Sequence, residues 1–138
     1  MLAGARIFAI VPTTDLARAR RFYGGTLDLP EVAVPGGDQA IDEGQLAFAG
    51  ADGSVLFIYQ RPMAAPPEHT VAGFAVDAFD ETVDALIARG VTFEVYRDMP
   101  GVQWDERGVA DMGGMRGAWF KDPDGNILAL EEMPEGFG

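Results

Sequence analysis

The sequence predicts an α+β domain made of two tandem modules, each with one strand, one helix and three strands in the order βαβββ. Two observations predict it: apolar runs and amphipathic helical segments occur twice in the same order, and Gly- and Pro-rich turns separate them. A chain of 138 residues without cysteine suits one domain that buries a core without disulfides. We therefore assign residues 1–138 to a single domain, with module 1 at about 5–61 and module 2 at about 69–133.

Module 1 opens with a predicted strand, Arg6 to Thr13, which is rich in Ile, Val and Phe. Thr14 and Asp15 are candidate N-caps of the helix that follows, and Gly24-Gly25 is expected to end it. The rest of the module is predicted to contain the strand Glu31 to Pro35, a turn at Pro35 to Asp38, and the strands Gln45 to Gly50 and Ser54 to Gln60 around the hairpin signal Asp52-Gly53.

Module 2 follows a proline-rich linker, Arg61 to Glu68, and its helix is expected to end at Gly90. The segment Met99 to Gly117 is predicted to be a long irregular loop, a feature that is usually functional or mobile in a compact domain. The apolar face of the helix consists of Phe79, Val83, Leu86 and Ile87. The predicted strands are Val71 to Val76, Val91 to Tyr96, Gly117 to Lys121 and Asn126 to Glu132.

A weak internal repeat relates the two modules. A shift of 63 residues places Phe8 on Val71, and the opening strands and helices then coincide without a gap. A shift of 72 residues places the segment 52–56 on the segment 124–128. The two shifts differ by nine residues, an insertion that the predicted loop between Met99 and Gly117 can hold.

The order and spacing of these motifs resemble the vicinal-oxygen-chelate superfamily, which includes glyoxalases, extradiol dioxygenases, epimerases, fosfomycin-modifying transferases and bleomycin-resistance proteins. The resemblance covers roughly residues 6–132. It is carried by the opening strand and helix at 11–23, by the strand at 73–77, and by the closing hairpin at 122–128, which is the most specific of the three. The resemblance implies the glyoxalase/bleomycin resistance/dioxygenase fold, in which two βαβββ modules form a cupped mixed sheet.

In metal-using members of this superfamily, each module contributes two metal ligands from strands that face a shared cup. By the resemblance, the corresponding positions here are Phe8, Phe57, Val71 and Ala129. All four side chains are hydrocarbon, whereas divalent metals need imidazole, carboxylate or comparable donors. The resemblance therefore implies a member that lacks the usual metal ligands, and we expect no metal and no cofactor. His69, the only histidine, is expected at a strand start or in solvent; a role as a ligand or proton carrier is the alternative.

Strand alternation extends the predicted cup to positions two residues away from the former ligand positions. The candidate ligand-binding residues are Phe8, Ile10, Phe57, Tyr59, Val71, Trp104, Met112, Ala129 and Glu131. Tyr59 and Glu131 are also the candidate catalytic acid–base residues. Trp104 could stack on a flat ligand or anchor its loop to the sheet. Phe8 and Phe57 could bind the ligand or fill the cup as core.

The formal net charge of −12 excludes nucleic acid and anionic membrane surfaces as expected partners and favours a cationic small molecule. An acidic surface that only confers solubility is the alternative. The N-terminus has no signal-peptide pattern, and no apolar stretch approaches the roughly 20 residues that span a bilayer. We therefore expect a cytoplasmic protein, and the resemblance implies a homodimer.

Two functions from different classes follow. The first is a metal-independent small-molecule-binding protein of the glyoxalase/bleomycin-resistance type, which sequesters an apolar or cationic aromatic compound. The alternative is an enzyme of the same superfamily, a lyase, isomerase or dioxygenase, that uses an acid–base carboxylate or a non-standard metal site. The hydrocarbon side chains at the former ligand positions disfavour metal-dependent glyoxalase or dioxygenase activity.

Overall fold

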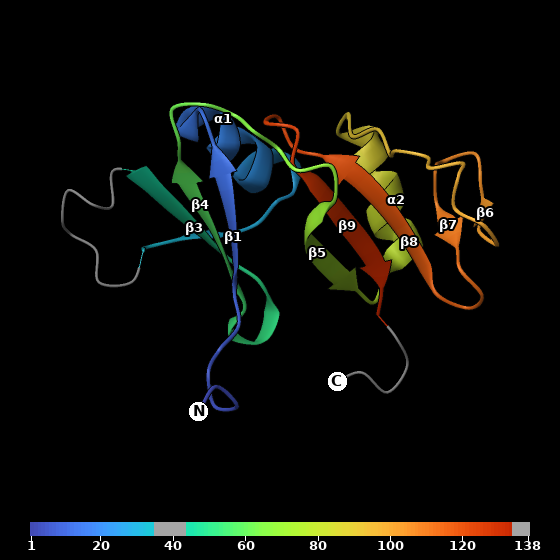
Figure 1. The fold of residues 1–138 in the computed structure, drawn as a ribbon, viewed down its shortest axis with the longest axis horizontal. Coiled ribbons are helices and arrows are strands. Elements are labelled where there is room, and N and C mark those ends of the chain that lie inside the picture. The colour runs from blue at the N-terminus through green and yellow to red at the C-terminus, as the bar shows by residue number, and fades with distance from the viewer. Residues whose placement is uncertain (35–43, 134–138) are drawn as a thin grey trace. The chain divides into compact units, whose positions relative to one another are not determined.

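The computed structural model describes residues 1–34 and 44–133 and divides the chain into two compact units, Met1–Ala65 and Pro66–Gly138. The boundary falls within the segment predicted to be a proline-rich linker. Each unit contains one mixed sheet and one principal helix, which confirms the predicted α+β class (Figure 1). None of the helices in the described residues has the length and apolar character needed to cross a bilayer.

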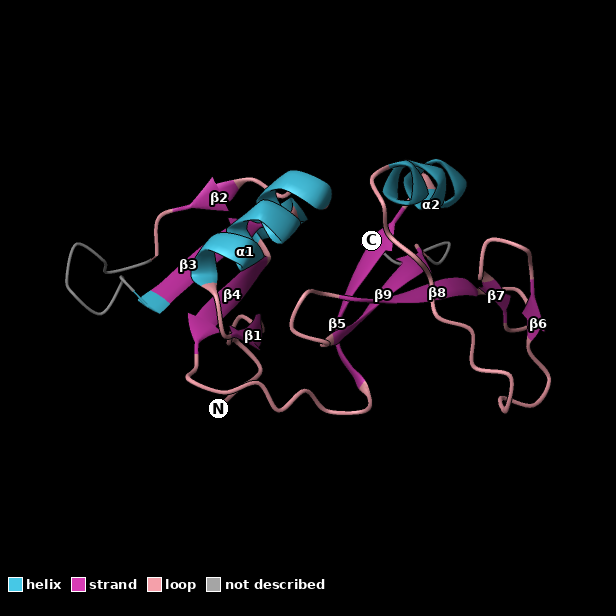
Figure 2. Ribbon diagram, turned by 90° about the horizontal axis from the view of Figure 1, so that it is seen from above, coloured by secondary structure: helices cyan, strands magenta, loops and turns pink. Residues whose placement is uncertain are grey.

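The N-terminal unit is a four-stranded sheet with a helix over one face (Figure 2). Its elements are β1 (Ala9–Thr13), α1 (Leu16–Arg20), a π-helical turn (Arg21–Thr26), β2 (Glu31–Val32), β3 (Gln45–Ala49), a 3-10 turn (Ala51–Gly53) and β4 (Val55–Gln60). The strand order is β1-β4-β3-β2, in which β1 runs parallel to β4 and the other pairs are antiparallel. Val11, Phe48 and Ile58 are fully buried, and Tyr23 packs on Phe48 with ring centroids 5.9 Å apart. The predicted turn at Pro35 to Asp38 lies outside the described residues.

The first helix begins where the sequence predicts and ends later than predicted. Asp15 is its N-cap, and Asp15 Oδ1 accepts a hydrogen bond from the Arg18 backbone N–H at 3.0 Å. Gly24-Gly25 does not end the helix, because neither glycine adopts a positive φ. The helix widens into a π-turn instead, and the chain leaves it at Asp28, whose φ is 58°. A left-handed aspartate therefore takes the role that was expected of the glycines.

The C-terminal unit is a five-stranded sheet that α2 covers on one face (Figure 2). Its elements are β5 (Thr70–Val76), α2 (Phe79–Ala88), β6 (Gln103–Trp104), β7 (Ala110–Asp111), β8 (Arg116–Lys121) and β9 (Ile127–Glu132). The strand order is β5-β9-β8-β7-β6, and β5 runs parallel to β9. Phe79, Val83 and Leu86 are buried as predicted, whereas Ile87 is 40% exposed. Gly90, with a φ of 93°, ends the helix as predicted.

Two predictions about the second module are wrong, for one physical reason. The predicted strand Val91 to Tyr96 makes a single bridge, Glu94 to Trp119, and the predicted irregular loop contains the β6–β7 hairpin. β7 and the segment Val91 to Tyr96 pair with the same edge of β8. Because β7 pairs with Arg116 and Gly117, only the part of that edge near Trp119 remains for the segment Val91 to Tyr96. The β6–β7 hairpin therefore belongs to the sheet, and it limits how far the segment Val91 to Tyr96 can pair with β8.

The internal repeat is preserved in the strand register. Ile10 is paired with Phe57 in the N-terminal unit, and Gly73 is paired with Ala129 in the C-terminal unit. These pairs are related by the shifts of 63 and 72 residues that the sequence predicts. The β6–β7 hairpin lies in the segment that was expected to hold the nine-residue difference between the shifts.

The turn between β8 and β9 is built around a buried carboxylate. Asp122 is 6% exposed, and its Oδ1 accepts hydrogen bonds from the backbone N–H groups of Asp124 and Asn126, both at 2.9 Å. Asp122 Oδ2 accepts a third bond from Asn126 Nδ2 at 2.8 Å. Gly125 completes the turn with a φ of 88°, a conformation that favours glycine. The three donors compensate the burial of the carboxylate.

Replacement of Asp122 by Ala should lower the free energy of unfolding by roughly 3 kcal/mol, because it removes the buried acceptor of three hydrogen bonds. Urea unfolding followed by circular dichroism measures the change. Ser54→Ala is the matched control in the hairpin of the N-terminal unit, where the exposed hydroxyl donates one hydrogen bond to Ala51 O at 2.7 Å. Equal losses for the two variants would contradict the assigned role of Asp122.

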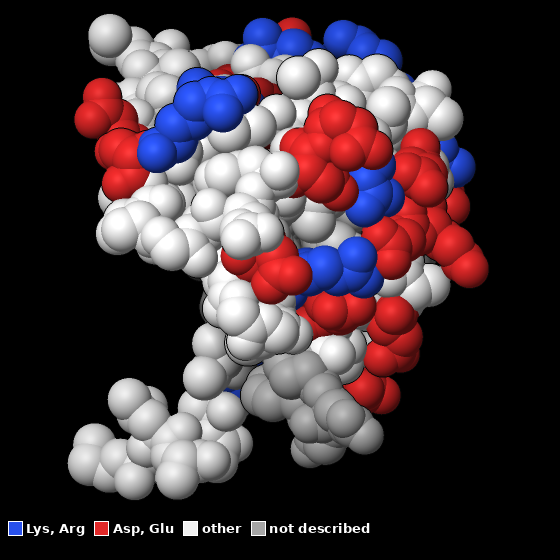
Figure 3. Space-filling model, turned by 90° about the vertical axis from the view of Figure 1, so that its right-hand side faces the viewer, with Lys and Arg blue, Asp and Glu red and all other residues white. Residues whose placement is uncertain are grey.

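An ion-pair network fastens α2 to the β6–β7 hairpin, β8 and β9. Its members are Asp80, Asp84, Asp105, Arg107, Arg116 and Glu132. Asp80 lies at the centre, 2.8 Å from Arg116 Nη2 and 2.9 Å from Arg107 Nη2. Arg116 also lies over the Phe79 ring, with its Cζ 4.9 Å from the ring centroid. Figure 3 shows basic groups interspersed among the acidic side chains on this side of the molecule.

Hydrogen bonds from Arg116 and then Arg107 lower the pKa of Asp80 from 3.8 to about 2. The folded state therefore gains stability from the ionised Asp80 above about pH 3.8, and loses it as the pH falls through 2. We expect Asp80→Asn to unfold at a lower urea concentration than wild type at pH 6, with the difference shrinking between pH 4 and 2. Asp77→Asn, which removes an exposed carboxylate outside the network, should show no such convergence. A pH-independent difference for Asp80→Asn would contradict the assignment.

Candidate functional site

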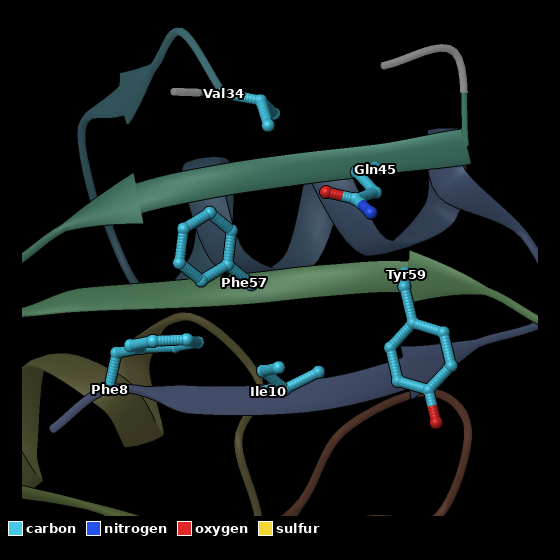
Figure 4. Close-up of a pocket in the computed structure, with 6 residues that line it drawn as sticks. All are labelled: Phe8, Ile10, Val34, Gln45, Phe57 and Tyr59. Carbon is cyan, nitrogen blue, oxygen red and sulfur yellow. The ribbon is translucent and has the colours of Figure 1, made fainter. Parts of the chain in front are cut away.

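A hollow of about 560 Å³ lies on the sheet of the N-terminal unit. The residues that line it are Phe8, Ile10, Val34, Gln45, Phe57 and Tyr59. Figure 4 shows these side chains in front of the strands, with the helix behind them. The hollow therefore occupies the face of the sheet that α1 does not cover.

Strand alternation explains why these residues share one face. On β4, Leu56 and Ile58 are buried, whereas the intervening Phe57 is only half-buried and faces the hollow. Ile10 is the register partner of Phe57 on β1. Phe8 meets Phe57 edge to face, with ring centroids 5.0 Å apart and planes at 73°. The apolar wall thus consists of Ile10 on β1, Phe57 on the neighbouring β4, and Phe8, which precedes β1.

The apolar wall remains accessible to solvent. Phe8 is 52% exposed and Ile10 is 54% exposed, although both are large hydrophobic residues. Apolar side chains with this exposure can gain free energy by burying more surface against a ligand or a partner.

Two polar side chains lie at one end of this wall. Gln45 on β3 and Tyr59 on β4 are register partners across the antiparallel pair. Neither makes a hydrogen bond within the described parts of the chain. The amide and the phenol hydroxyl can therefore donate to or accept from a ligand. Tyr59 as a general acid or base would need a positioned partner, and residues 1–34 and 44–133 offer it none.

The C-terminal unit has a second hollow, of about 350 Å³. It is lined by Glu68, His69, Thr70, Tyr96, Asp98, Met99, Trp119 and Ile127. Trp104 does not line it but packs against two of its aromatic residues, with ring centroids 5.9 Å from Trp119 and 6.4 Å from Tyr96. This position matches the anchoring alternative for Trp104, in which the ring attaches its segment to the sheet.

The structure brings together four of the predicted ligand-binding residues, Phe8, Ile10, Phe57 and Tyr59, around the N-terminal hollow. The other five, Val71, Trp104, Met112, Ala129 and Glu131, line neither of these two hollows. Val71 lies at a bulge in β5, Ala129 is 4% exposed, Glu131 is exposed on β9, and Met112 is 38% exposed after β7.

Sequence reasoning missed several lining residues. Gln45 could have been found, because the hairpin centred on Asp52-Gly53 sets the register that places it opposite Tyr59. Tyr96 and Asp98 could not, because their place depends on the partial pairing of their segment with β8. Val34 carries no signal in the sequence that points to a site.

The side chains at the four former ligand positions do not fit a divalent metal. Phe8, Phe57, Val71 and Ala129 offer no nitrogen or oxygen donor. Elsewhere in residues 1–34 and 44–133, no three His, Asp or Glu side chains gather closely enough to hold an ion. No chemistry through a metal can be derived from the donors that are present.

The sequence profile of the Glyoxalase/Bleomycin resistance protein/Dioxygenase superfamily matches residues 6–130. The chain is similar to a glyoxalase/dioxygenase from Nostoc punctiforme, with 21% identity, a TM-score of 0.68, and coverage of 97% of this chain and 94% of that one. It is similar to TnmS3, an antibiotic binding protein from Streptomyces sp. CB03234, with 23% identity, a TM-score of 0.66, and coverage of 97% and 100%.

A third similar structure is the fosfomycin resistance protein FosX from Mesorhizobium loti, with 20% identity, a TM-score of 0.61, and coverage of 98% of this chain and 96% of that one. No curated protein matches the sequence. Identities this low establish the fold and leave the activity to be argued from the site.

Proposed function

The chain belongs to the Glyoxalase/Bleomycin resistance protein/Dioxygenase superfamily, and from this membership we propose that it is a metal-independent small-molecule-binding protein. The N-terminal hollow binds an apolar or aromatic compound and sequesters it. The observation that carries the proposal is the exposed apolar wall of Phe8, Ile10 and Phe57. It ends at the polar groups of Gln45 and Tyr59, which have no hydrogen-bond partner in the described residues. Apolar walls with a few polar groups are typical of ligand sites.

The apolar wall supplies the affinity in this proposal. An aromatic ring that buries about 150 Å² at about 25 cal/mol per Å² gains roughly 4 kcal/mol before the costs of association. Gln45 and Tyr59 orient a polar substituent of the ligand. The net charge of −12 favours a cationic ligand, mainly by raising its association rate.

One of the similar structures supports a binding role, since it is described as an antibiotic binding protein. The alternative, an enzyme that uses Tyr59 or Glu131 as acid or base, has less support. Glu131 is exposed on β9, so water solvates its carboxylate. Neither side chain has an orienting partner in the described residues.

The proposal is tested with three probes that share a naphthalene ring: neutral 1-naphthalenemethanol, cationic 1-naphthylmethylamine and anionic 1-naphthoate. We expect the alcohol to bind and the amine to bind more tightly, as measured by calorimetry. Ile10→Asp should weaken binding of the alcohol at least roughly tenfold, because the ring would desolvate a carboxylate. Ile10 is 54% exposed, so the substitution should leave the fold intact.

Val32→Asp is the matched control, because Val32 is an exposed residue of β2 that does not line the hollow. It should leave binding unchanged. Equal affinity for the amine and the naphthoate would assign the acidic surface to solubility alone. If the alcohol does not bind, or if both variants weaken it equally, the proposed site is wrong.

Membership of the superfamily also motivates a homodimer, an expectation that rests on analogy. Sedimentation equilibrium at micromolar concentration should give about twice the mass of one 14.8 kDa chain. A single species at the mass of one chain would contradict it.

A further inference from the structure

We propose that the hollow of the C-terminal unit is a second binding site, selective for an organic ammonium ion that carries a small apolar body. The proposal rests on the C-terminal unit alone. It holds whether or not the N-terminal hollow binds a ligand.

The wall of this hollow has an aromatic corner. The rings of Tyr96 and Trp119 lie with centroids 5.9 Å apart and planes at 71°, and both line the hollow. Trp104 contacts both rings from outside the lining. Aromatic faces attract organic cations through their quadrupoles, and Trp is the strongest of them. Ile127 and Met99 add apolar surface for the body of the ligand.

The charged side chains of the lining are carboxylates, which only accept. Glu68 and Asp98 contribute carboxylates, and no Lys or Arg of the described chain lines the hollow. His69 Nδ1 lies 3.1 Å from Thr70 O. Because a carbonyl only accepts, this nitrogen donates the hydrogen bond. A ligand that matches this lining has N–H donors and a positive charge.

Tyr96 supplies an observation that packing does not explain. Its hydroxyl is buried and has no hydrogen-bond partner in the described residues. Burial, followed by the charge of Glu94, raises the pKa of Tyr96, so the hydroxyl stays protonated. A phenylalanine would fill the same place without an unsatisfied polar group. The hydroxyl is therefore assigned to the ligand, which gives it a partner after a small movement of the ring.

An organic ion fits this hollow better than a metal ion. The His, Asp and Glu side chains of the described residues do not gather closely enough to hold a metal. The nearby Lys121 is 3.3 Å from Glu94, so that pair adds little net charge. A volume of about 350 Å³ is at the low end of the range for ligand sites, which suits a one-ring amine.

The test compares phenethylamine, a cation at pH 7, with neutral phenethyl alcohol and anionic 3-phenylpropionate. Tryptophan fluorescence and calorimetry measure binding to the full chain. We expect phenethylamine to bind several-fold more tightly than the alcohol, and the propionate not to bind. Asp98→Asn should weaken the amine about threefold to fivefold and leave the alcohol unchanged. Asp52→Asn makes the same change of charge in the N-terminal unit and should have no effect.

Tyr96→Phe separates recognition from folding. If the hydroxyl serves the ligand, the variant binds phenethylamine several-fold more weakly, and its thermal midpoint does not fall. A lower midpoint with unchanged affinity would make Tyr96 a structural residue and overturn the proposal. Equal binding of amine and alcohol, or equal effects of Asp98→Asn and Asp52→Asn, would also overturn it.

One further variant distinguishes this proposal from the function proposed above. Ile10→Asp alters the N-terminal hollow only and should leave phenethylamine binding intact. If Ile10→Asp abolishes that binding, the amine occupies the N-terminal hollow. In that case the second site is wrong and the first stands.

Discussion

The parallel pairing of the first and last strand of each unit is the contact on which the other features depend. β1 pairs with β4, and β5 pairs with β9. Parallel neighbours cannot be joined by a tight turn, so the chain between them must cross over a face of the sheet. Each crossover carries a helix, α1 or α2, which covers that face (Figure 2). The helices of the described residues leave the opposite face uncovered by their own unit, and alternation along the strands gives that face a separate set of side chains.

The two uncovered faces share a register and differ in chemistry. Phe57 pairs with Ile10 where Ala129 pairs with Gly73, so one module presents bulky apolar side chains at positions where the other has almost none. The polar side chains differ as well: an amide and a phenol line one hollow, whereas carboxylates and an imidazole line the other. An internal repeat can therefore preserve the backbone while the side chains that line the two hollows diverge.

Local patterns in the sequence predicted the fold class, the repeat and the apolar wall of the N-terminal hollow. Phe8 and Phe57 were predicted from the family resemblance, and Ile10 and Tyr59 followed because alternation along a strand is a local rule. The wrong strand and loop predictions in the second module arose where segments distant in the sequence compete for pairing with the same strand edge. Tyr96 lies in a segment that shares the edge of β8 with an inserted hairpin, and no local pattern reports that competition. The end of the first helix was misplaced because a positive φ at Asp28, not glycine, turns the chain.

Hydrocarbon side chains occupy the positions that correspond to metal ligands by the family resemblance, and they limit what each face can do. A metal at the centre of a site polarises a substrate there, whereas Phe8 and Phe57 can only bury apolar surface. Polar recognition must then come from the ends of strands. Gln45 is the first residue of β3, Tyr59 is the penultimate residue of β4, and His69 directly precedes β5. An apolar centre with hydrogen-bonding groups at its edge suits the retention of an intact molecule better than the activation of one of its bonds. Two observations favour a binding role over a catalytic one. The polar groups lie at the edge of the apolar centre, and Tyr59 has no orienting partner in the described residues.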